Sequence, residues 1–192
     1  MNGKFYAMLF RMKSIMRWGL MYNTKSESLS EHSFECAVLA HALALIGNKY
    51  FGKEYDCEHI AACALLHDMS ETLTGDLPTP VKYSTDELKT AYKKIEKKAE
   101  NRLLSLLPDE LRGEYAALAD PSEEERAIVK AADRLCAYIK CRDELSRGNP
   151  EFRTACEIIR QSIDTSDCIE LKYFMDNCVG SFGENLDTAL NG

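Results

Sequence analysis

The sequence predicts an all-α protein, and three observations support that fold class. Apolar residues recur at spacings of three and four along most of the chain, which is the period of one face of an α-helix. Serine followed three residues later by glutamate, a pattern that caps helix N-termini, precedes three of these apolar segments. The alternation of apolar and polar residues that strands require is nearly absent. We therefore expect a helical bundle.

The first two strongly predicted helices lie in the N-terminal half of the chain. Ser28 and Glu31 form a capping box that opens an apolar-rich segment running to about Gly47. Asp56 can cap the second helix, which we expect to end near Thr74-Gly75, because glycine suits the left-handed residue that closes a helix.

The middle of the chain is predicted to contain a loop and two further helices. Residues 76–80 cannot form a helix interior, because both prolines lack an amide donor and restrict the residue before them. Ser84 and Glu87 form a second capping box, and Pro108 interrupts the helix that follows it. A short helix is expected over residues 109–118. The apolar face of the helix before Pro108 carries Leu88, Ala91, Tyr92, Ile95, Ala99 and Leu103.

The C-terminal third is predicted to begin with a long helix. Ser122 and Glu125 form its capping box, and Asn149-Pro150 is a cap followed by proline at the first position of another helix. One or two more helices carry the chain to about Asn177. With no repeat and no linker, residues 1–192 are predicted to form a single domain. The buried side of the long helix is expected to carry Ile128, Val129, Ala132, Leu135, Cys136 and Ile139.

Composition narrows the classes of function. The chain has 192 residues, of which 24 are basic and 31 are acidic, giving a net charge of −7. This balance argues against nucleic-acid binding, which needs a concentrated basic surface, although it permits a small phosphorylated ligand. No run of 18 apolar residues exists, and basic residues interrupt Met1–Met21, so we expect no membrane span and no signal peptide. A cytoplasmic location is the expectation.

Cysteine spacing offers no sign of a structural zinc site. None of the eight cysteines forms a C-x-x-C pair, which also weighs against a thioredoxin-type motif. We expect all eight to be reduced thiols with packing or surface roles.

The most informative residues are His67 and Asp68, which follow an apolar stretch. An ionised aspartate buried there must be paired or coordinate a metal, and adjacent residues on a helix splay by about 100°. Other helices must therefore complete any metal site, and His32 and Asp133 are the candidates. Two imidazoles and two carboxylates suit Mn²⁺, Co²⁺, Fe²⁺ or Zn²⁺. Taken alone, each residue also has a structural explanation; Asp133, for example, could be a salt-bridged helix residue beside Arg134.

The order of these residues resembles the H…HD…D motif of the HD-domain superfamily of phosphohydrolases. Five blocks, in the same order, further resemble the bacterial 5′-deoxynucleotidase family of the YfbR type, across about residues 5–180. The blocks are Ile15–Trp18, Leu29–Ser33, His67–Glu71, Leu73–Tyr83 and Ala132–Tyr138. Arg134 departs from the family, where we expect a small residue, and its side chain is expected to point away from the ion.

The resemblance implies one divalent metal ion held by His32, His67, Asp68 and Asp133. Co²⁺ and Mn²⁺ are the first expectations, with Zn²⁺, Fe²⁺, Cu²⁺ and Mg²⁺ as alternatives. Glu71 is expected to take a proton from water, and its alternative role is a surface ion pair with a lysine. Asp68, as a ligand of the metal ion, is expected to be catalytic together with Glu71.

The same resemblance implies a nucleotide site. Arg17 is expected to bind the phosphate and to take part in catalysis, and Trp18 is expected to leave no room for a 2′-hydroxyl. Asp76 would accept a hydrogen bond from the 3′-hydroxyl. Without the resemblance, Arg17 would be interpreted as a surface cation and Trp18 as a core residue. The proline loop would be interpreted as a simple turn of the chain. The remaining expected substrate contacts are Leu77, Pro78 and Thr79, with His32, Asp68 and Asp133 from the metal site.

The implied function is hydrolysis of deoxyribonucleoside 5′-monophosphates to deoxynucleoside and phosphate, with weak action on ribonucleotides. The same metal core could serve a phosphodiesterase, a nucleoside triphosphohydrolase or an alarmone hydrolase. Outside enzymes, a nucleotide-binding module without turnover is the alternative. Relatives suggest a homodimer.

Overall fold

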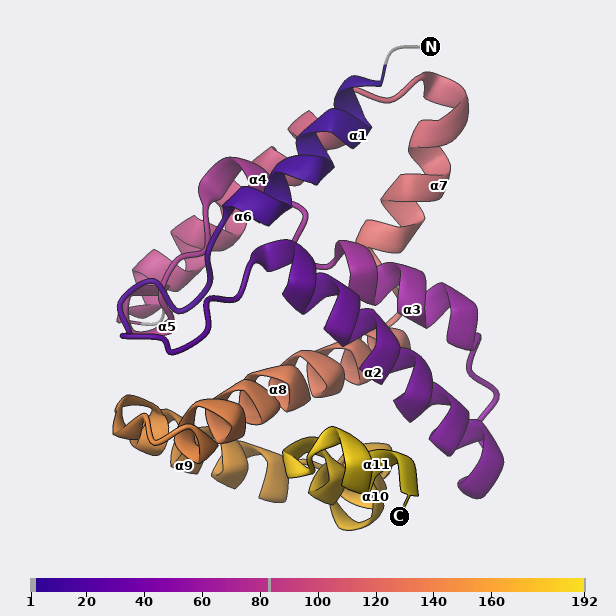
Figure 1. Ribbon diagram of the computed structural model, residues 1–192. Helices are drawn as coiled ribbons and strands as arrows, with labels where there is room; N and C mark the ends of the chain where they lie inside the picture. The colour runs from indigo at the N-terminus through magenta and orange to yellow at the C-terminus, as the bar shows by residue number, and fades with distance from the viewer. Residues whose placement is uncertain (1–2, 83, 192) are drawn as a thin grey trace.

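The computed structural model describes residues 3–82 and 84–191, and its regular structure in those residues is helical (Figure 1). The only β-type pairing recorded in this part of the chain is a single antiparallel bridge between Met16 and Ser28. The all-α prediction is therefore confirmed. Among the described helices, none combines the length and apolar character needed to cross a bilayer.

The elements of the N-terminal half are α1 (Lys4–Leu9), η1 (Phe10–Ser14), α2 (Leu29–Tyr50), α3 (Cys57–Leu66), α4 (Glu71–Thr74), α5 (Thr79–Lys82) and α6 (Asp86–Leu104). The elements that follow are α7 (Asp109–Ala119), α8 (Glu123–Ser146), η2 (Pro150–Phe152), α9 (Arg153–Asp164), α10 (Ile169–Asn177), η3 (Val179–Gly183) and α11 (Leu186–Asn191). In Figure 1, α2 and α8 occupy the centre, with α3 beside α2 and α9 to α11 on the far side of α8.

Two hydrophobic clusters hold this arrangement together. The larger one joins α2, α3, α8 and α10, and includes the fully buried Leu43, Ile60 and Leu135. The smaller one packs Phe5 of α1 and Leu66 of α3 against the end of α6. Burial of an aliphatic or aromatic side chain of this size contributes about 1.5–3 kcal/mol. The site described below lies where α2, α3 and α8 converge.

Several predicted helix starts are confirmed. Glu31 donates its backbone amide to Ser28 Oγ while Ser28 donates its amide to the Glu31 carboxylate, so the predicted capping box opens α2. Ser122 and Glu125 make the same reciprocal pair at α8. Asp56 accepts from the third residue of α3, as predicted.

The prediction for the second helix is wrong in its extent, because α3 ends at Leu66. The His67 ring contacts the Ala64 carbonyl through Nδ1 at 2.7 Å. In a continuous α-helix that carbonyl would accept the amide of Asp68, whereas here it accepts the amide of His67 at 3.5 Å and faces the imidazole as well. Tight turns replace the helix, with Glu71 N donating to Asp68 O at 3.0 Å. Gly75, with φ of 74°, closes α4 in the predicted place.

Two details around the proline loop also differ from the prediction. Thr85, rather than Ser84, caps α6 by accepting the amide of Leu88, because Ser84 Oγ donates to the carbonyl of Val81 instead. Residues 79–82 form the short helix α5, in which Pro80 occupies the first turn and needs no amide donor. Tyr83 lies outside the described residues.

The apolar stripe predicted along α6 is buried only in part. Tyr92, Ala99 and Leu103 are buried, whereas Leu88 is 36% exposed and Ile95 is 51% exposed. The stripe loses its cover toward the N-terminus of α6, since α1 and α7 pack against this helix and the small cluster they share lies at its C-terminal end.

Candidate active site

Three helical segments bring the predicted metal ligands together. His32 lies in the first turns of α2 and is fully buried, His67 and Asp68 follow α3, and Asp133 lies in the middle of α8. His67 Nε2 is 3.0 Å and His32 Nε2 is 3.6 Å from Asp68 Oδ2. His32 Nε2 is also 3.2 Å from Asp133 Oδ1. Ligand atoms of His32, His67 and Asp68 all lie within 4.8 Å of one another.

The two imidazoles present a donor set that fits a divalent metal. His32 Nε2 and His67 Nε2 are both buried, and among the described residues neither makes a hydrogen bond of suitable geometry, although carboxylate oxygens lie nearby. His67 Nδ1 faces the Ala64 carbonyl, which favours the tautomer that leaves the Nε2 lone pair free for an ion. Two imidazole nitrogens and a carboxylate oxygen of Asp68 within 4.8 Å of one another match the preference of first-row divalent ions.

The charges of the cluster are strongly coupled. Burial alone would raise the pKa of Asp68, but His67, His32 and Arg17 outweigh it and lower that pKa. Burial likewise opposes the ionised form of Asp133, whereas His32 and His67 lower its pKa. Burial would lower the pKa of His32, but Asp133 and Cys136 raise it to about 10. The carboxylates are therefore ionised, and a divalent cation bound here would supply the positive charge that protonated imidazoles otherwise supply.

Glu71 is a buried carboxyl group held close to this cluster. It is the first residue of α4, a separate short helix, and not part of one continuous helix with His67, which corrects the prediction. Its Oε2 atom is buried and makes no hydrogen bond within residues 3–82 and 84–191. Burial, followed by the charges of Asp68 and Asp76, raises the pKa of Glu71 to about 8. A carboxyl group in this environment holds a proton close to neutral pH.

Arg17 and Trp18 lie on the loop between η1 and α2. The Arg17 side chain is mostly buried, and its Nη1 donates to Asp68 Oδ2 at 3.4 Å. Trp18 has φ of 59°, in the left-handed region that bulky residues rarely occupy. Its ring lies 5.3 Å from that of Phe152. The loop therefore carries a guanidinium next to the metal-ligand cluster and an aromatic ring beside it.

A cavity of about 790 Å³ lies beside the cluster, which is ample for a small ligand. Of the predicted substrate contacts, Arg17, Trp18, Asp76, Pro78, Thr79 and Asp133 line it. Leu77, His32 and Asp68 are not in its wall, and neither are His67 and Glu71. Arg17 and Asp133 connect the cavity to the cluster, because Arg17 contacts Asp68 and Asp133 contacts His32.

Known proteins resemble this chain along nearly its whole length. A model of the 5′-deoxynucleotidase YfbR-like family matches residues 4–182. The chain is 50% identical over 186 residues to the 5′-deoxynucleotidase YfbR of Salmonella arizonae, covering 95% of this chain and 94% of that protein. It is 50% identical over 189 residues to a 5′-deoxynucleotidase of Erwinia tasmaniensis, covering 97% and 96%. The chain belongs to the YfbR-like 5′-deoxynucleotidase family.

Solved structures agree on the fold. An HD-domain phosphohydrolase from Listeria innocua superposes with a TM-score of 0.81 at 23% identity, covering 93% of this chain and 88% of that one. A cyanophage S-2L HD phosphohydrolase, bound to dA and one catalytic Zn²⁺ ion, gives a TM-score of 0.64 at 22% identity, covering 91% and 95%. The predicted resemblance and the HD-domain bundle are both confirmed.

Several residues of this YfbR-like site were not anticipated. Arg134, singled out as unusual for the family, donates through Nη1 to the carbonyl of Ser162 in α9 and lines the cavity. Lys130, one turn earlier on α8, lines it as well. The apolar wall on α9 includes Ile158, which is 62% exposed. Ile158 is therefore an exposed apolar residue in the cavity wall, and its position there is visible only in the folded chain.

Proposed function

We propose that this protein hydrolyses deoxyribonucleoside 5′-monophosphates to deoxynucleoside and phosphate, and acts weakly on ribonucleotides. The observation that carries the proposal is that His32, His67 and Asp68 offer ligand atoms within 4.8 Å of one another, with Asp133 Oδ1 3.2 Å from His32 Nε2, beside a cavity lined by Arg17 and Trp18. Membership of the YfbR-like family supports the same substrate class, because its members at 50% identity are named 5′-deoxynucleotidases.

His32, His67, Asp68 and Asp133 would hold one divalent metal ion. Such an ion, when bound, lowers the pKa of water and offsets charge on phosphoryl oxygens. We propose Co²⁺ or Mn²⁺ first, and Zn²⁺ is supported by the ion bound to the cyanophage relative. The feature that favours a metal over a purely structural cluster is that the Nε2 atoms of His32 and His67 are buried and make no hydrogen bond in the part of the chain described.

Glu71 is the proposed proton carrier of the reaction. Its carboxyl group is buried, and its Oε2 atom makes no hydrogen bond in the part of the chain described. Attack on phosphorus requires a water molecule to lose a proton, and the leaving deoxynucleoside oxygen must gain one. A carboxyl group whose pKa lies near neutrality can accept and later return that proton.

Arg17 is the proposed phosphate ligand. Its guanidinium reaches from the cavity wall to Asp68, so an anion bound at the cavity end next to the cluster meets positive charge. The planar fork of arginine can donate to two phosphate oxygens at once. Asp68 keeps the guanidinium in place before the substrate arrives, which limits the entropy lost on binding.

Trp18 and Asp76 are the proposed sugar contacts. Trp18 is held on a tightly constrained loop in the cavity wall, where its ring can exclude a 2′-hydroxyl by contact. Asp76 is partly buried in the same wall and can accept from the 3′-hydroxyl. Pro78 and Thr79 extend this wall, while Leu77 would act from behind it.

Phosphate release from dAMP and AMP by metal-stripped protein, before and after addition of Co²⁺, Mn²⁺, Zn²⁺ or Mg²⁺, tests the proposal. We expect metal-restored release from dAMP and little from AMP. A matching panel of dATP and cyclic AMP distinguishes a triphosphohydrolase or phosphodiesterase. Nucleotide binding without phosphate release under any metal would refute the enzyme and support a binding module.

We also propose a homodimer in the cytoplasm. Phe34, Val38 and Leu45 project from one side of α2 and are 64%, 52% and 48% exposed, which makes that side a candidate interface. All eight cysteines are free, as is usual for a cytoplasmic protein. Sedimentation of the wild type and a Val38→Asp variant tests the dimer, which the charge should dissociate.

A further inference from the structure

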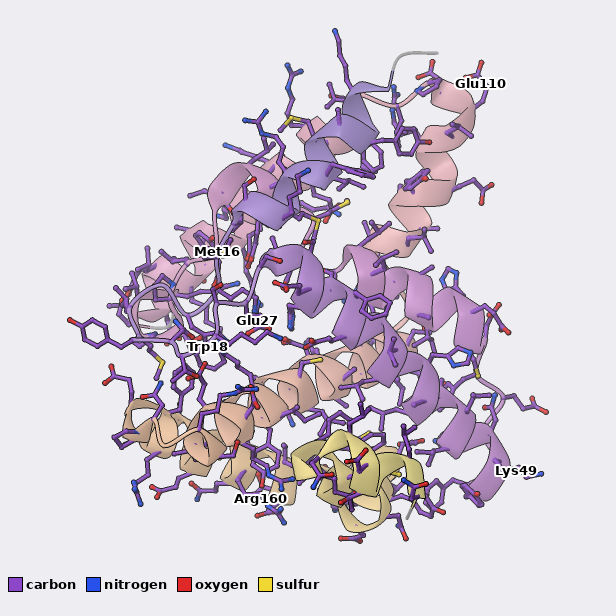
Figure 2. All side chains as sticks on the ribbon, in the orientation of Figure 1. Met16, Trp18, Glu27, Lys49, Glu110 and Arg160 are labelled. Atoms are coloured by element: carbon purple, nitrogen blue, oxygen red, sulfur yellow. The ribbon has the colours of Figure 1, made fainter. Side chains whose placement is uncertain are left out.

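Glu27, a residue with no role predicted from the sequence, lies where three proposed site residues meet. It is buried at the end of the loop that precedes α2. Trp18 Nε1 donates to Glu27 Oε2 at 2.7 Å, and Figure 2 shows these two labelled side chains on the same part of the molecule. The other carboxylate oxygen, Oε1, lies 3.7 Å from Arg17 Nε and 3.6 Å from His32 Nδ1. One carboxylate thus contacts all three.

The negative charge of Glu27 faces two nitrogen atoms that lack other acceptors. Arg17 Nε and His32 Nδ1 are both buried and make no hydrogen bond in the described chain, and Glu27 is the carboxylate paired with each. His32 Nε2 points the other way, toward Asp68 and Asp133. A carboxylate behind a metal-binding histidine fixes the orientation of the ring and raises its basicity.

Glu27 also holds Trp18 in an unfavourable backbone conformation. Trp18 is the only non-glycine residue with positive φ among the described residues, and this backbone conformation is unfavourable for a residue with a side chain. Surrounding contacts must maintain it. The Glu27 side chain binds the indole, and the Glu27 carbonyl accepts the Arg17 amide at 2.9 Å. The wall that faces the sugar is therefore positioned by Glu27 from both its side chain and its backbone.

We propose that Glu27 is a positioning residue that sets sugar selectivity through Trp18 and orients Arg17 and His32 through its charge. This inference rests on the proposed function for the roles of Trp18, Arg17 and His32. It adds a residue that touches neither the cavity nor the ligand atoms of the metal cluster.

Two substitutions separate the two parts of the proposal. Glu27→Gln keeps an oxygen that can accept from the indole but removes the charge, whereas Glu27→Ala removes both. Glu144→Gln is the matched control, because Glu144 holds the same loop through Thr24 and Lys25. The readouts are kcat and KM for dAMP and AMP, metal affinity by titration with Co²⁺, and acrylamide quenching of fluorescence. Trp18 is the only tryptophan, so its fluorescence reports on this position alone.

Glu27→Gln is expected to lower Co²⁺ affinity or kcat for dAMP by about 10- to 100-fold while keeping the dAMP-to-AMP ratio. Glu27→Ala is expected to lower that ratio as well and to make Trp18 more accessible to acrylamide. Glu144→Gln should lower stability but leave both the ratio and the quenching unchanged.

The proposal is overturned if the Glu27 variants change only the unfolding temperature, with ratio, metal affinity and quenching like those of Glu144→Gln. If Glu27→Ala does not fold, Glu27→Gln alone must still lose metal affinity or kcat at an unchanged ratio. If the wild type hydrolyses neither nucleotide, the proposed function fails, but Co²⁺ titration and quenching still decide whether Glu27 positions His32 and Trp18.

Discussion

Glu144 on α8 provides a strong test of how this fold holds its active-site loop. The side chain is fully buried and accepts hydrogen bonds from Thr24 N at 2.8 Å, Thr24 Oγ1 at 2.7 Å and Lys25 N at 3.2 Å. Asn149 Nδ2 at 2.8 Å and the Lys140 ammonium complete the set. Removal of the Glu144 carboxylate would therefore leave several buried hydrogen-bond donors without an acceptor.

The expected cost follows from those contacts. Glu144→Ala leaves a mostly buried Lys140 charge unpaired and amides unsatisfied, and removal of one partner of a buried pair costs about 3–5 kcal/mol. Glu144→Gln keeps some acceptor capacity, so we expect a loss of about 1.5–3 kcal/mol, the range for a hydrogen bond to a charged group. Urea unfolding near neutral pH, followed by circular dichroism, measures both differences if the slopes match the wild type.

The pH dependence has a definite sign. Burial would raise the pKa of Glu144, but hydrogen bonds from Lys140, Asn149 and Thr24 outweigh it and hold the pKa well below the ordinary value of 4.5. A depressed folded-state pKa gives stability that is complete above the unfolded pKa and is lost as pH falls toward the folded one. The difference between wild type and Glu144→Gln should therefore be constant from neutral pH down to about pH 5.5. Below that it should shrink by up to about 1.4 kcal/mol per pH unit. A difference that stays the same down to the acid unfolding of the wild type would refute the role of the charge.

Three further predictions concern catalysis. Trp18→Ala should reduce the preference for dAMP over AMP by about 10- to 100-fold, measured as the ratio of kcat/KM values; an unchanged ratio removes Trp18 from sugar selection. Glu71→Ala should lower kcat by about 100- to 10,000-fold while bound metal per chain, measured by mass spectrometry, stays at the wild-type level; full activity would exclude proton transfer by Glu71. Arg17→Lys should lower kcat/KM for dAMP by about tenfold or more, because lysine cannot donate as a fork, and equal activity would show that a point charge suffices.

Local sequence accounts well for helix starts. Capping boxes at Ser28 and Ser122 depend on a side chain and a backbone amide three residues apart, so the local pattern predicts them, although the same pattern at Ser84 forms no box because Thr85 caps α6 instead. The end of α3 shows the opposite case. The apolar pattern of α3 continues past Leu66, yet the helix ends there, and the His67 ring contacts the Ala64 carbonyl through Nδ1. The two residues are only three apart in the sequence, but the orientation of the His67 ring depends on the cluster that it faces.

The sequence by itself determined the helical fold class, the family and the four candidate metal ligands, because periodicity, capping patterns and motif order are properties of neighbouring or ordered residues. It could not determine Glu27, whose three partners lie at different distances along the chain and meet only when the loop folds back onto α2. It could not predict the α9 wall of the cavity either, since Ile158 reads locally as part of an amphipathic helix. Only tertiary packing decides which side chains of distant segments share one buried space, and the burial and charge coupling that act on Glu71 and Glu144 follow from that packing.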